Sequence, residues 1–514
     1  MNIWRKKSLE LYNEEIKTTG LKRVLGKWEL MAIGIGAIIG AGIFVMAGVG
    51  AKDHAGPALA LSFVLAGFGC AFAGLCYAEF ASKVPVEGSA YAYSYNTMGE
   101  LFAWIIGWDL VLEYAMGASA VAVGWSGYLS KFLAHFLNIK LPIWLMNDYY
   151  TVTDKLIKIS NTELLQDYSS LNIPEIFGFN FCINLPAFLG IWLASLILIK
   201  GIKEATSSNN ILVIIKVAVL LFVVFVGIAC INLENWTPFI PDAKPIIVDG
   251  VEKGSQFGFK GILSGAAYIF FAYIGFDVVS TSAGEAKNPK KDVPFGIIGA
   301  LAFCTILFIA VSLVLTGMVP YDKIDRAAPI ADAFKQNNMP WAELIISIAA
   351  IAGLTSVLIM MLLGQSRVFY AMSKDGLLPK SFSALHSKFK TPYKTSLLFA
   401  VLASLVSAFT PINKIADMCN IGTLLAFVMV CIAVMIMRKR DENTLENDGT
   451  KEVGFKTPFL YVVAPLGIAF NLLMMLSLEA VNWYRLLIWL GIGFVIYFLY
   501  SYHNSNLNKN ISGK

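Results

Sequence analysis

The chain has 514 residues, of which 57% are hydrophobic and only 15% are charged, and its formal net charge is +5. A soluble protein of this length cannot bury so much apolar surface in one or two cores. The composition therefore excludes an ordinary soluble protein and predicts an integral membrane protein.

Apolar stretches recur along the chain at roughly the 20 residues that one helix needs to cross a bilayer. The predicted fold is all-α and integral to the membrane, with twelve transmembrane helices at residues 29–50, 57–82, 100–135, 183–200, 207–231, 258–284, 295–319, 341–371, 395–410, 415–437, 457–477 and 480–502. The first stretch is too long for the apolar part of a cleavable signal peptide.

Basic residues predict the orientation of these helices. If the N-terminus is cytoplasmic, the inner segments hold 26 of the 40 lysine and arginine residues, in agreement with the positive-inside rule. An even number of helices then places both termini in the cytoplasm. The predicted location is the cell membrane, as a multi-pass protein of the cytoplasmic or inner membrane. This asymmetry accounts for the net charge, so binding of nucleic acid need not be invoked.

The first predicted helix contains a cluster of glycines, Gly34, Gly36, Gly40 and Gly42. Glycine destabilises a helix interior by about 1 kcal/mol relative to alanine, and an unwound backbone is tolerated in lipid only where it faces a protein-lined cavity. We expect a binding site here. The alternative is that the glycines only permit close packing of helices.

The third predicted helix carries two acidic residues, Asp109 and Glu113, which are four positions apart and therefore share one face. A charged residue near the centre of a membrane helix costs at least about 2.5 kcal/mol and indicates function. Glu113 can face the substrate, where it would favour a cationic side chain, or take part in proton transfer. It can equally be a buried structural acid, and we expect Asp109 to have a gating or structural role.

The fifth predicted helix is apolar except for Lys216. A buried amine can gain and lose a proton during a transport cycle, and in its charged form it can hold neighbouring helices together. The alternative is a lysine whose side chain extends to the cytoplasmic interface.

The sixth predicted helix is interrupted by an aromatic and glycine-containing string that ends in Asp277. The first and sixth helices occupy equivalent positions if the first ten helices divide into two halves of five. Paired broken helices of this kind indicate a secondary transporter with inverted repeats and a site near the middle of the bilayer. We expect Asp277 to cap the second half of its helix or to gate the pathway.

The two breaks offer complementary backbone groups. Freed N–H groups favour a carboxylate, and we expect them at Ile39, Gly40, Ala41, Gly42 and Ile43. Freed carbonyl groups favour an ammonium group, and we expect them near Phe271, Ala272 and Ile274. A zwitterion satisfies both, which predicts an amino acid as substrate. The aromatic rings of Phe271 and Tyr273 fit either a neutral or a cationic side chain.

Cysteine and histidine residues predict no metal site. The seven cysteines are scattered without a CxxC pair, and the four histidines lie far apart. We expect no cofactor and no enzymatic activity, because the sequence offers neither a nucleophile with its base nor a metal cluster.

Four strings resemble the amino acid-polyamine-organocation superfamily, specifically its cationic amino acid transporter branch with its bacterial amino acid permeases. They are GAIIGAGIFV, EFASKVPVEGSAYAYSY, FFAYIGFDVVSTSAGEAKNPKKDVP and GQSRVFYAMSKDGLLP, and they occur in order between about Lys27 and Pro392. The resemblance implies a five-plus-five inverted repeat, two additional C-terminal helices and alternating access.

The resemblance also implies roles for individual residues. Lys216 matches a lysine that replaces the sodium ion of sodium-coupled relatives and is associated with proton coupling. Its amine is then expected near the backbone of Gly36 to Ile39 and near the hydroxyl groups of Thr355 and Ser356. Glu113 matches a glutamate that is typical of the branch.

These expectations divide the chain into six parts. They are a cytoplasmic tail (1–28), the first five-helix repeat (29–232), the second repeat (258–437), a cytoplasmic loop (438–456), helices 11 and 12 (457–502) and a second tail (503–514). The external loop at 138–182 is polar and aligns with nothing, and the sequence does not indicate an oligomeric state.

Three functions remain open. The first is proton-coupled import of amino acids, with arginine, lysine or ornithine favoured by Glu113 and neutral amino acids possible. The second is exchange of one amino acid against another or against a polyamine. The third is a sensor that binds an amino acid without moving it.

Overall fold

The computed structural model describes residues 3–8, 11–12, 23–83, 88–153, 173–176, 179–200, 202–248, 251–389, 391–448 and 454–512. Part of the external loop predicted at 138–182 lies outside these residues. Within them, nine helical stretches are long and apolar enough to cross a membrane, and two shorter apolar helices accompany them. The first long stretch, Lys27–Lys83, contains two of the predicted crossings, α2 and α4.

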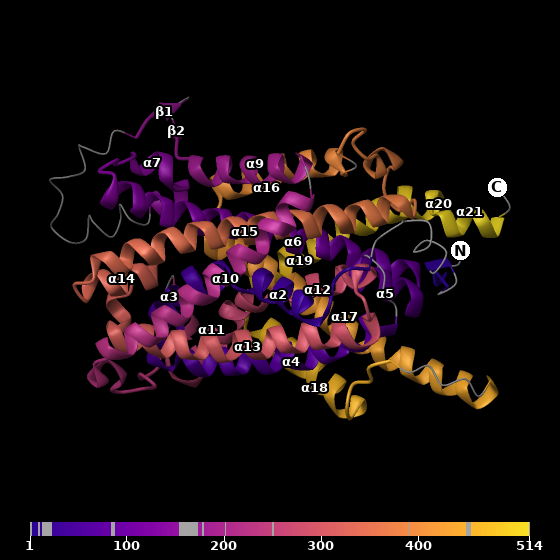
Figure 1. Cartoon of the computed structure of the whole chain (residues 1–514), viewed down its shortest axis with the longest axis horizontal. Coiled ribbons are helices and arrows are strands. Elements are labelled where there is room, and N and C mark those ends of the chain that lie inside the picture. The colour runs from indigo at the N-terminus through magenta and orange to yellow at the C-terminus, as the bar shows by residue number, and fades with distance from the viewer. Residues whose placement is uncertain are drawn as a thin grey trace.

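The main helices run along the long axis of the molecule (Figure 1). They are α2 (Lys27–Ile38), α4 (Leu59–Lys83), α6 (Glu100–Phe136), α9 (Leu185–Lys200), α10 (Ile202–Gly227), α11 (Gly258–Ile269), α12 (Val278–Thr281), α13 (Pro289–Met318), α15 (Pro340–Lys374), α16 (Tyr393–Phe409), α17 (Ile412–Asp448), α18 (Leu460–Ser477) and α19 (Ala480–Ile496).

Shorter elements connect them. They are α3 (Ala47–Val49), α5 (Ser89–Thr97), α7 (Ile143–Met146), α14 (Pro329–Gln336), α20 (Tyr502–Asn504), α21 (Asn506–Ser512) and two antiparallel hairpins, β1 (Glu175–Ile176) with β2 (Phe179–Asn180) and β3 (Lys244–Val248) with β4 (Val251–Gln256). The hairpins were not predicted, and they lie in connections between helices.

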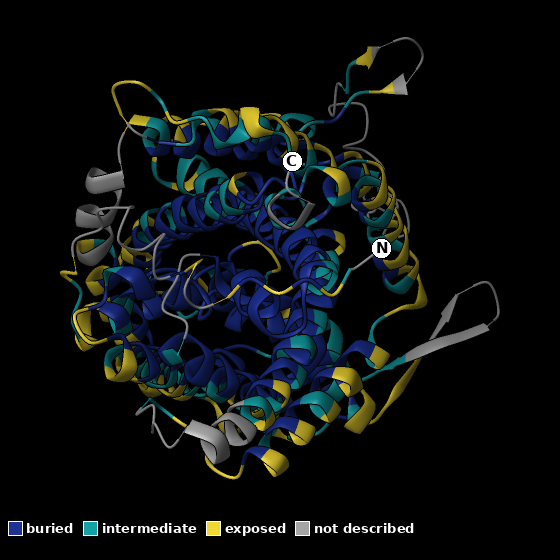
Figure 2. Ribbon diagram, turned by 90° about the vertical axis from the view of Figure 1, so that its right-hand side faces the viewer, coloured by how far each residue is buried: buried dark blue, intermediate teal, exposed yellow. Residues whose placement is uncertain are grey.

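Burial separates an inner set of helices from an outer set. The most apolar window of the stretch Gly258–Thr281 is 89% buried, whereas the corresponding windows of α18 and of Ala480–Asn504 are 33% and 22% buried. Figure 2, viewed along the bundle, shows buried ribbon at the centre and exposed ribbon around it. Since lipid can cover the apolar outer surface, this arrangement needs no further protein around it.

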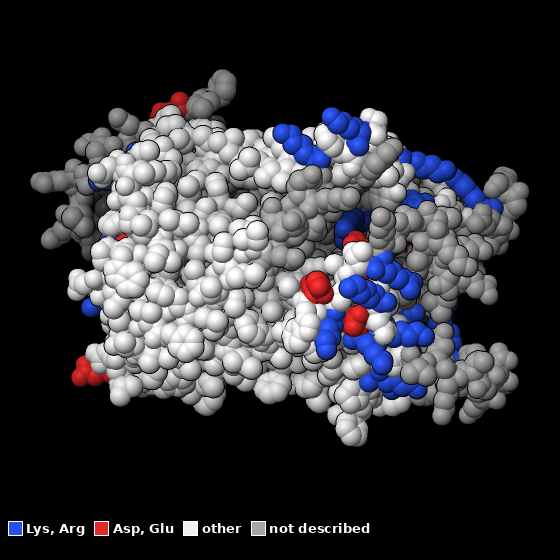
Figure 3. Space-filling model, viewed as in Figure 1, with Lys and Arg blue, Asp and Glu red and all other residues white. Residues whose placement is uncertain are grey.

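Both termini lie at one end of the bundle (Figure 1), and lysine and arginine side chains gather at the same end (Figure 3). We call it the basic end and the other the opposite end. The segment predicted as a cytoplasmic loop, 438–456, is not a loop throughout, because α17 continues as a helix to Asp448. The sequence RKRDENTLEND contains neither glycine nor proline, so nothing in it ends the helix earlier.

A buried ion pair fastens the helices at the basic end. Glu79, on α4, is fully buried and binds the guanidinium group of Arg438 on α17, whose Nε donates over 2.9 Å. The backbone N–H of Thr457 donates to the same carboxylate over 2.8 Å. This one side chain therefore joins α4, α17 and the segment that leads into α18.

We expect Glu79→Ala to lower the free energy of unfolding by about 3 kcal/mol, because it leaves the arginine charge buried without its partner. Thermal unfolding of the purified protein measures the change. Glu234→Ala removes an exposed carboxylate and serves as the control. Equal melting temperatures for the two variants would contradict the structural role of Glu79.

Candidate functional site

The first membrane stretch is broken in the middle. Helix α2 ends at Ile38, residues 39 and 40 are non-helical, and a wide helical turn begins at Gly42. Ile39 N–H still donates to Ile35, and Phe44 N–H donates to Gly40. Between these bonds, the N–H groups of residues 40–42 have no acceptor in the described part of the chain. The sequence predicts free N–H groups from Ile39 to Ile43, and the bond to Ile35 removes Ile39 from that set because α2 keeps its last hydrogen bond.

The sixth predicted helix is also broken. Helix α11 ends at Ile269, a short 3₁₀ turn follows at Phe270–Tyr273, and the chain is irregular until α12 begins at Val278. Ile274 N–H donates to the carbonyl of Phe271, whereas the carbonyl groups of Ala272 and Ile274 have no donor among the described residues. Two carbonyl groups are thus available for a ligand, whereas the carbonyl of Phe271, also expected to be free, is occupied because the 3₁₀ turn ends on it.

The two breaks touch each other. A Cβ atom on Gly42 would lie 2.2 Å from the Cα of Ala272, so no larger residue fits there without movement. Gly275 has φ of +116°, a region that L-residues rarely adopt, and a Cβ on it would lie 3.0 Å from the backbone of Ala37. Both glycines are required by this close approach of backbone to backbone.

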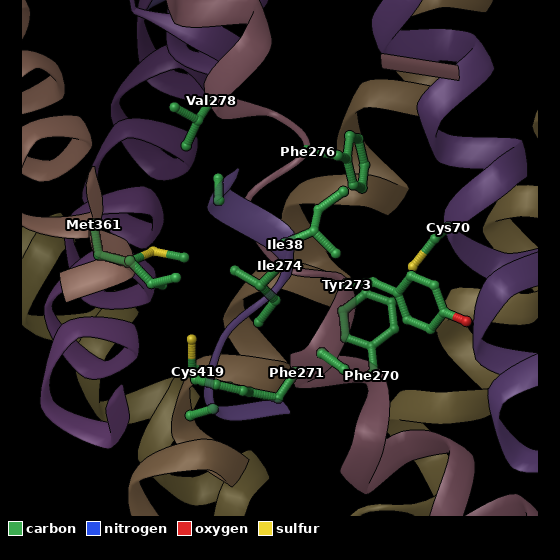
Figure 4. Close-up of a cluster of buried hydrophobic side chains, with 14 of the residues drawn as sticks. Ile38, Cys70, Phe270, Phe271, Tyr273, Ile274, Phe276, Val278, Met361 and Cys419 are labelled. Carbon is green, nitrogen blue, oxygen red and sulfur yellow. The ribbon is translucent and has the colours of Figure 1, made fainter. Parts of the chain in front are cut away.

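Apolar side chains surround the breaks. Figure 4 shows Ile274 with Ile38 and Tyr273 to one side, Met361 to the other, and Phe271 and Cys419 below. None of these six side chains is more than 4% exposed. The site is therefore closed to water in this conformation.

Lys216 crosses from α10 to the first break. Its side chain is fully buried, and its Nζ donates to the carbonyl of Gly36 over 2.7 Å and to that of Ile39 over 3.2 Å. In an unbroken helix these carbonyls would accept from the N–H groups of residues 40 and 43. The amine thus replaces donors that the break removes, at the backbone that the resemblance implies.

Two hydroxyl-bearing residues were expected beside this amine. Within the described chain, Thr355 donates to the carbonyl of Ile351 and accepts from Trp125 Nε1 over 3.0 Å, and neither bond involves Lys216. Ser356, which follows Thr355 on α15, is buried. The lysine stem instead contacts Gly353, where a Cβ would lie 2.9 Å from Lys216 Cγ.

Three buried carboxyl groups gather near the second break. Asp277 is at most 1% exposed, as are Asp109 and Glu113 on α6, and Glu113 lies within electrostatic range of both other acids. Asp277 takes the N-cap position of α12 without making the side-chain capping bond, and accepts instead from the hydroxyl group of Tyr114. The capping role expected for Asp277 is thus replaced by a link to α6.

The other two acids have no donor. Among the described residues, no hydrogen bond reaches the carboxylate oxygens of Asp109 or Glu113. Thr423 lies beside Glu113, but its hydroxyl group donates to the carbonyl of Cys419 over 3.0 Å. No described lysine or arginine forms an ion pair with the three acids. Carboxyl groups buried in this way must take up a proton or receive a cation.

Comparison with known proteins places the chain in a family. A family profile described as amino acid permease matches residues 25–501. The chain is 41% identical to the methylthioribose transporter of Bacillus subtilis, over 99% of this chain and 100% of that protein. It is 42% identical to the branched-chain amino acid permease BcaP of the same organism, over 99% of both chains. It is 37% identical to the vacuolar cationic amino acid transporter 4 of Arabidopsis thaliana, over 81% of this chain and 64% of that one.

The chain belongs to the amino acid permease family, within the amino acid-polyamine-organocation superfamily. It is a multi-pass membrane transporter and not an enzyme.

At the basic end of the permease, the two broken helices are tied together. Leu25, just before α2, pairs with Ala286 in a parallel bridge, and the N–H of Lys287 donates to the carbonyl of Leu25 over 2.8 Å. Arg367 on α15 lies 3.7 Å from Glu285 in the same segment. These contacts link the segment before α2 to the segment that follows α12.

At the opposite end, ion pairs join segments that are far apart in the chain. Lys131 on α6 lies 2.7 Å from Asp325, and Arg326 binds Asp53 through two hydrogen bonds of 2.6 and 2.8 Å. Burial alone would raise the pKa of Asp325, but Lys131 and two backbone N–H groups outweigh it and lower that pKa. The carboxylate therefore stays charged at neutral pH, and the closure weakens only in acid.

Sequence patterns did not identify several residues at the site of the permease. Tyr114 follows Glu113 directly, but its partner Asp277 is 163 positions away, and no local signal indicates that contact. Met361 and Cys419 are ordinary apolar residues on α15 and α17, and only the packing of the bundle brings them to the breaks.

We expect Gly42→Ala to weaken binding of every substrate by on the order of tenfold to a hundredfold, since overpacking against Ala272 costs about 1–3 kcal/mol. Gly491→Ala is the matched control, because a Cβ at Gly491 meets nothing within 4 Å. Isothermal titration with alanine, leucine and arginine measures the effect. Loss of only one substrate would show that Gly42 contacts a side chain instead of the common carboxylate.

Proposed function

We propose that this permease imports an amino acid together with a proton, by alternating access around the two broken helices. The observation that carries the proposal is the contact between Gly42 and Ala272, which brings free N–H groups within reach of free carbonyl groups. The N–H groups of Gly40, Ala41 and Gly42 bind the carboxylate. The carbonyls of Ala272 and Ile274 bind the ammonium group.

The side chain of the substrate is proposed to be neutral and apolar. Phe271, Ile274, Met361 and Cys419 surround the breaks, and a charged group among them would lose its hydration without compensation. Gly117, one turn after Glu113 on α6, leaves room here, since a Cβ on it would lie 3.5 Å from Met361 and 3.7 Å from Cys419. The permease BcaP, named for branched-chain amino acids, supports this choice.

A cationic substrate is the second candidate, supported by the three carboxyl groups of Asp109, Glu113 and Asp277. A guanidinium or ammonium group of the substrate could supply the charge that no described lysine or arginine supplies. The cationic amino acid transporters among the relatives agree with it. In this case Glu113 contacts the substrate, whereas for a neutral substrate it carries a proton or is structural.

Lys216 is proposed to couple the proton to transport. In its charged form the amine holds the two carbonyls that the break leaves without donors, and so stabilises one conformation of the first helix. Loss of the proton weakens these bonds and releases the helix. Thr355 and Ser356 are proposed to stabilise the amine in another state of the cycle.

The membrane arrangement is part of the proposal. The basic end is cytoplasmic together with both termini, because lysine and arginine gather there (Figure 3). Twelve helices follow if α2 and α4 are counted separately and α9 and α16 are added to the long helices. The two halves, 29–232 and 258–437, then form a five-plus-five inverted repeat, followed by helices 11 and 12 at 457–502.

We expect Lys216→Met to abolish accumulation driven by a proton gradient and to preserve exchange of labelled for unlabelled substrate, because methionine cannot donate to Gly36 and Ile39. Lys260→Met, which changes an exposed lysine, is the control. Uptake into proteoliposomes with and without an imposed gradient measures both activities.

Three results of this experiment would refute the proposed coupling. Full accumulation by Lys216→Met would contradict the role of the lysine. Wild-type protein that moves substrate only against an internal amino acid would be an exchanger. Binding without any movement would indicate a sensor.

We expect Glu113→Gln to change the dissociation constant for leucine by less than about twofold, because a neutral side chain makes no ion pair with it. Arginine binding to the wild type should be weaker than leucine binding. Asp109→Asn, one turn earlier on the same helix, is the control. Tight arginine binding that falls by more than about tenfold only in Glu113→Gln would establish the cationic alternative.

A further inference from the structure

A hollow of about 590 Å³ opens on the side of the bundle at the basic end. It lies between the start of α13 and the segment just before α18, and Phe295 and Phe455 form apolar parts of its wall. Lys290 and Lys291 stand on its rim and are exposed. Among the described residues, neither lysine has an ion-pair or hydrogen-bond partner.

An apolar groove of about 410 Å³ continues from this hollow along the bundle between α4 and α13. Ile298 lines both cavities, so they are adjacent. The groove extends along α13 from Ile298 to Ile309, which is about 17 Å at 1.5 Å per residue. This is roughly half of the 30 Å hydrocarbon core, the depth of one leaflet.

Small residues of α4 make the groove possible. Gly67 and Ala71 line its floor, while Phe68 and Ile306, which are 53% and 71% exposed, form parts of its edges. A Cβ on Gly67 would lie 2.9 Å from Thr305 of α13, so the two helices are already in close contact beneath it. The groove therefore faces outward to the membrane and not toward the amino acid site.

We propose that the hollow and groove together bind one anionic phospholipid. Its phosphate group lies at Lys290 and Lys291, and one acyl chain fills the groove between α4 and α13. The positive charge of the rim suits an anionic lipid. Asp292 is the only acidic residue between Lys287 and Gly299, and its carboxylate accepts a hydrogen bond from the N–H of Asn288 over 3.0 Å instead of pairing with either lysine.

The position of the groove gives the lipid a mechanical role. The face of α13 that turns away from the groove packs on α2, where a Cβ on Gly296 would lie 2.9 Å from Leu30 and a Cβ on Gly34 would lie 2.7 Å from Ala300. A bound lipid thus stabilises the helix against which the first half of the broken helix moves.

Native mass spectrometry of the full-length protein in detergent, titrated with phosphatidylglycerol or phosphatidylcholine, tests the proposal. We expect phosphatidylglycerol to bind more tightly, and the double variant Lys290→Gln/Lys291→Gln to lose about fivefold in affinity per lysine. The control pair, Lys380→Gln/Lys394→Gln, removes two other exposed lysines and should retain the wild-type affinity.

A second pair of variants tests the acyl chain. Ala302→Trp fills the groove and should weaken lipid binding on the order of tenfold, since each acyl-chain methylene that is excluded from the groove lowers the affinity about fourfold. Val401→Trp, on an exposed position of α16, should have no effect.

Three outcomes would overturn the proposal. The first is equal affinity for the two lipids, and the second is an equal loss of lipid affinity in the two double lysine variants. The third is that inorganic phosphate displaces the lipid while Ala302→Trp leaves lipid affinity unchanged. The last result would assign the site to a soluble anion. Binding is measured without transport, so the result is independent of the proposed substrate and proton coupling.

Discussion

Unpaired backbone groups in the middle of a membrane protein are the constraint on which this structure depends. Lipid offers no hydrogen bonds, and each unsatisfied N–H or carbonyl costs several kcal/mol there. The permease limits that cost by pressing the two breaks together at Gly42 and Ala272 and by bonding Lys216 to the carbonyls of Gly36 and Ile39. The groups that remain open form the proposed binding site, and a ligand with both charges would satisfy them.

Buried charges in this chain fall into two kinds. Glu79 and Arg438 satisfy each other, and Lys216 is satisfied by carbonyl groups, so these residues hold helices in place. Asp109 and Glu113 have neither kind of partner in the described chain. A buried carboxylate is normally paired with a donor or a cation of the protein, unless it binds a proton or a ligand instead. This difference in partners separates the paired acid Glu79 from the unpaired acids Asp109 and Glu113.

Main-chain bonds and ion pairs join the helices at both ends of the bundle. At the basic end, main-chain bonds between Leu25 and residues 285–287 tie the halves of the broken helices into one unit. At the opposite end, the N–H of Phe257, just before α11, donates to the carbonyl of His54, and side-chain ion pairs such as Lys131 with Asp325 add to this main-chain bond. Ion pairs near water break at little cost, whereas paired backbone does not separate easily. Both ends therefore combine main-chain bonds with ion pairs, and the exposed ion pairs are the contacts that break at the lower cost.

The sequence by itself determined the class of fold, the family resemblance and the two breaks, because these follow from local properties. Apolar length predicts a membrane helix, and the glycines from Gly34 to Gly42 and the string around Gly275 predict interrupted ones. The position of Lys216 beside Gly36 came from the family resemblance and not from periodicity. Only the tertiary structure decided that Tyr114 reaches Asp277, that Met361 and Cys419 surround the breaks, and that Thr355 bonds to Trp125. These contacts join helices far apart in the chain, and they depend on helix rotation and tilt, which a single sequence does not encode in any local pattern.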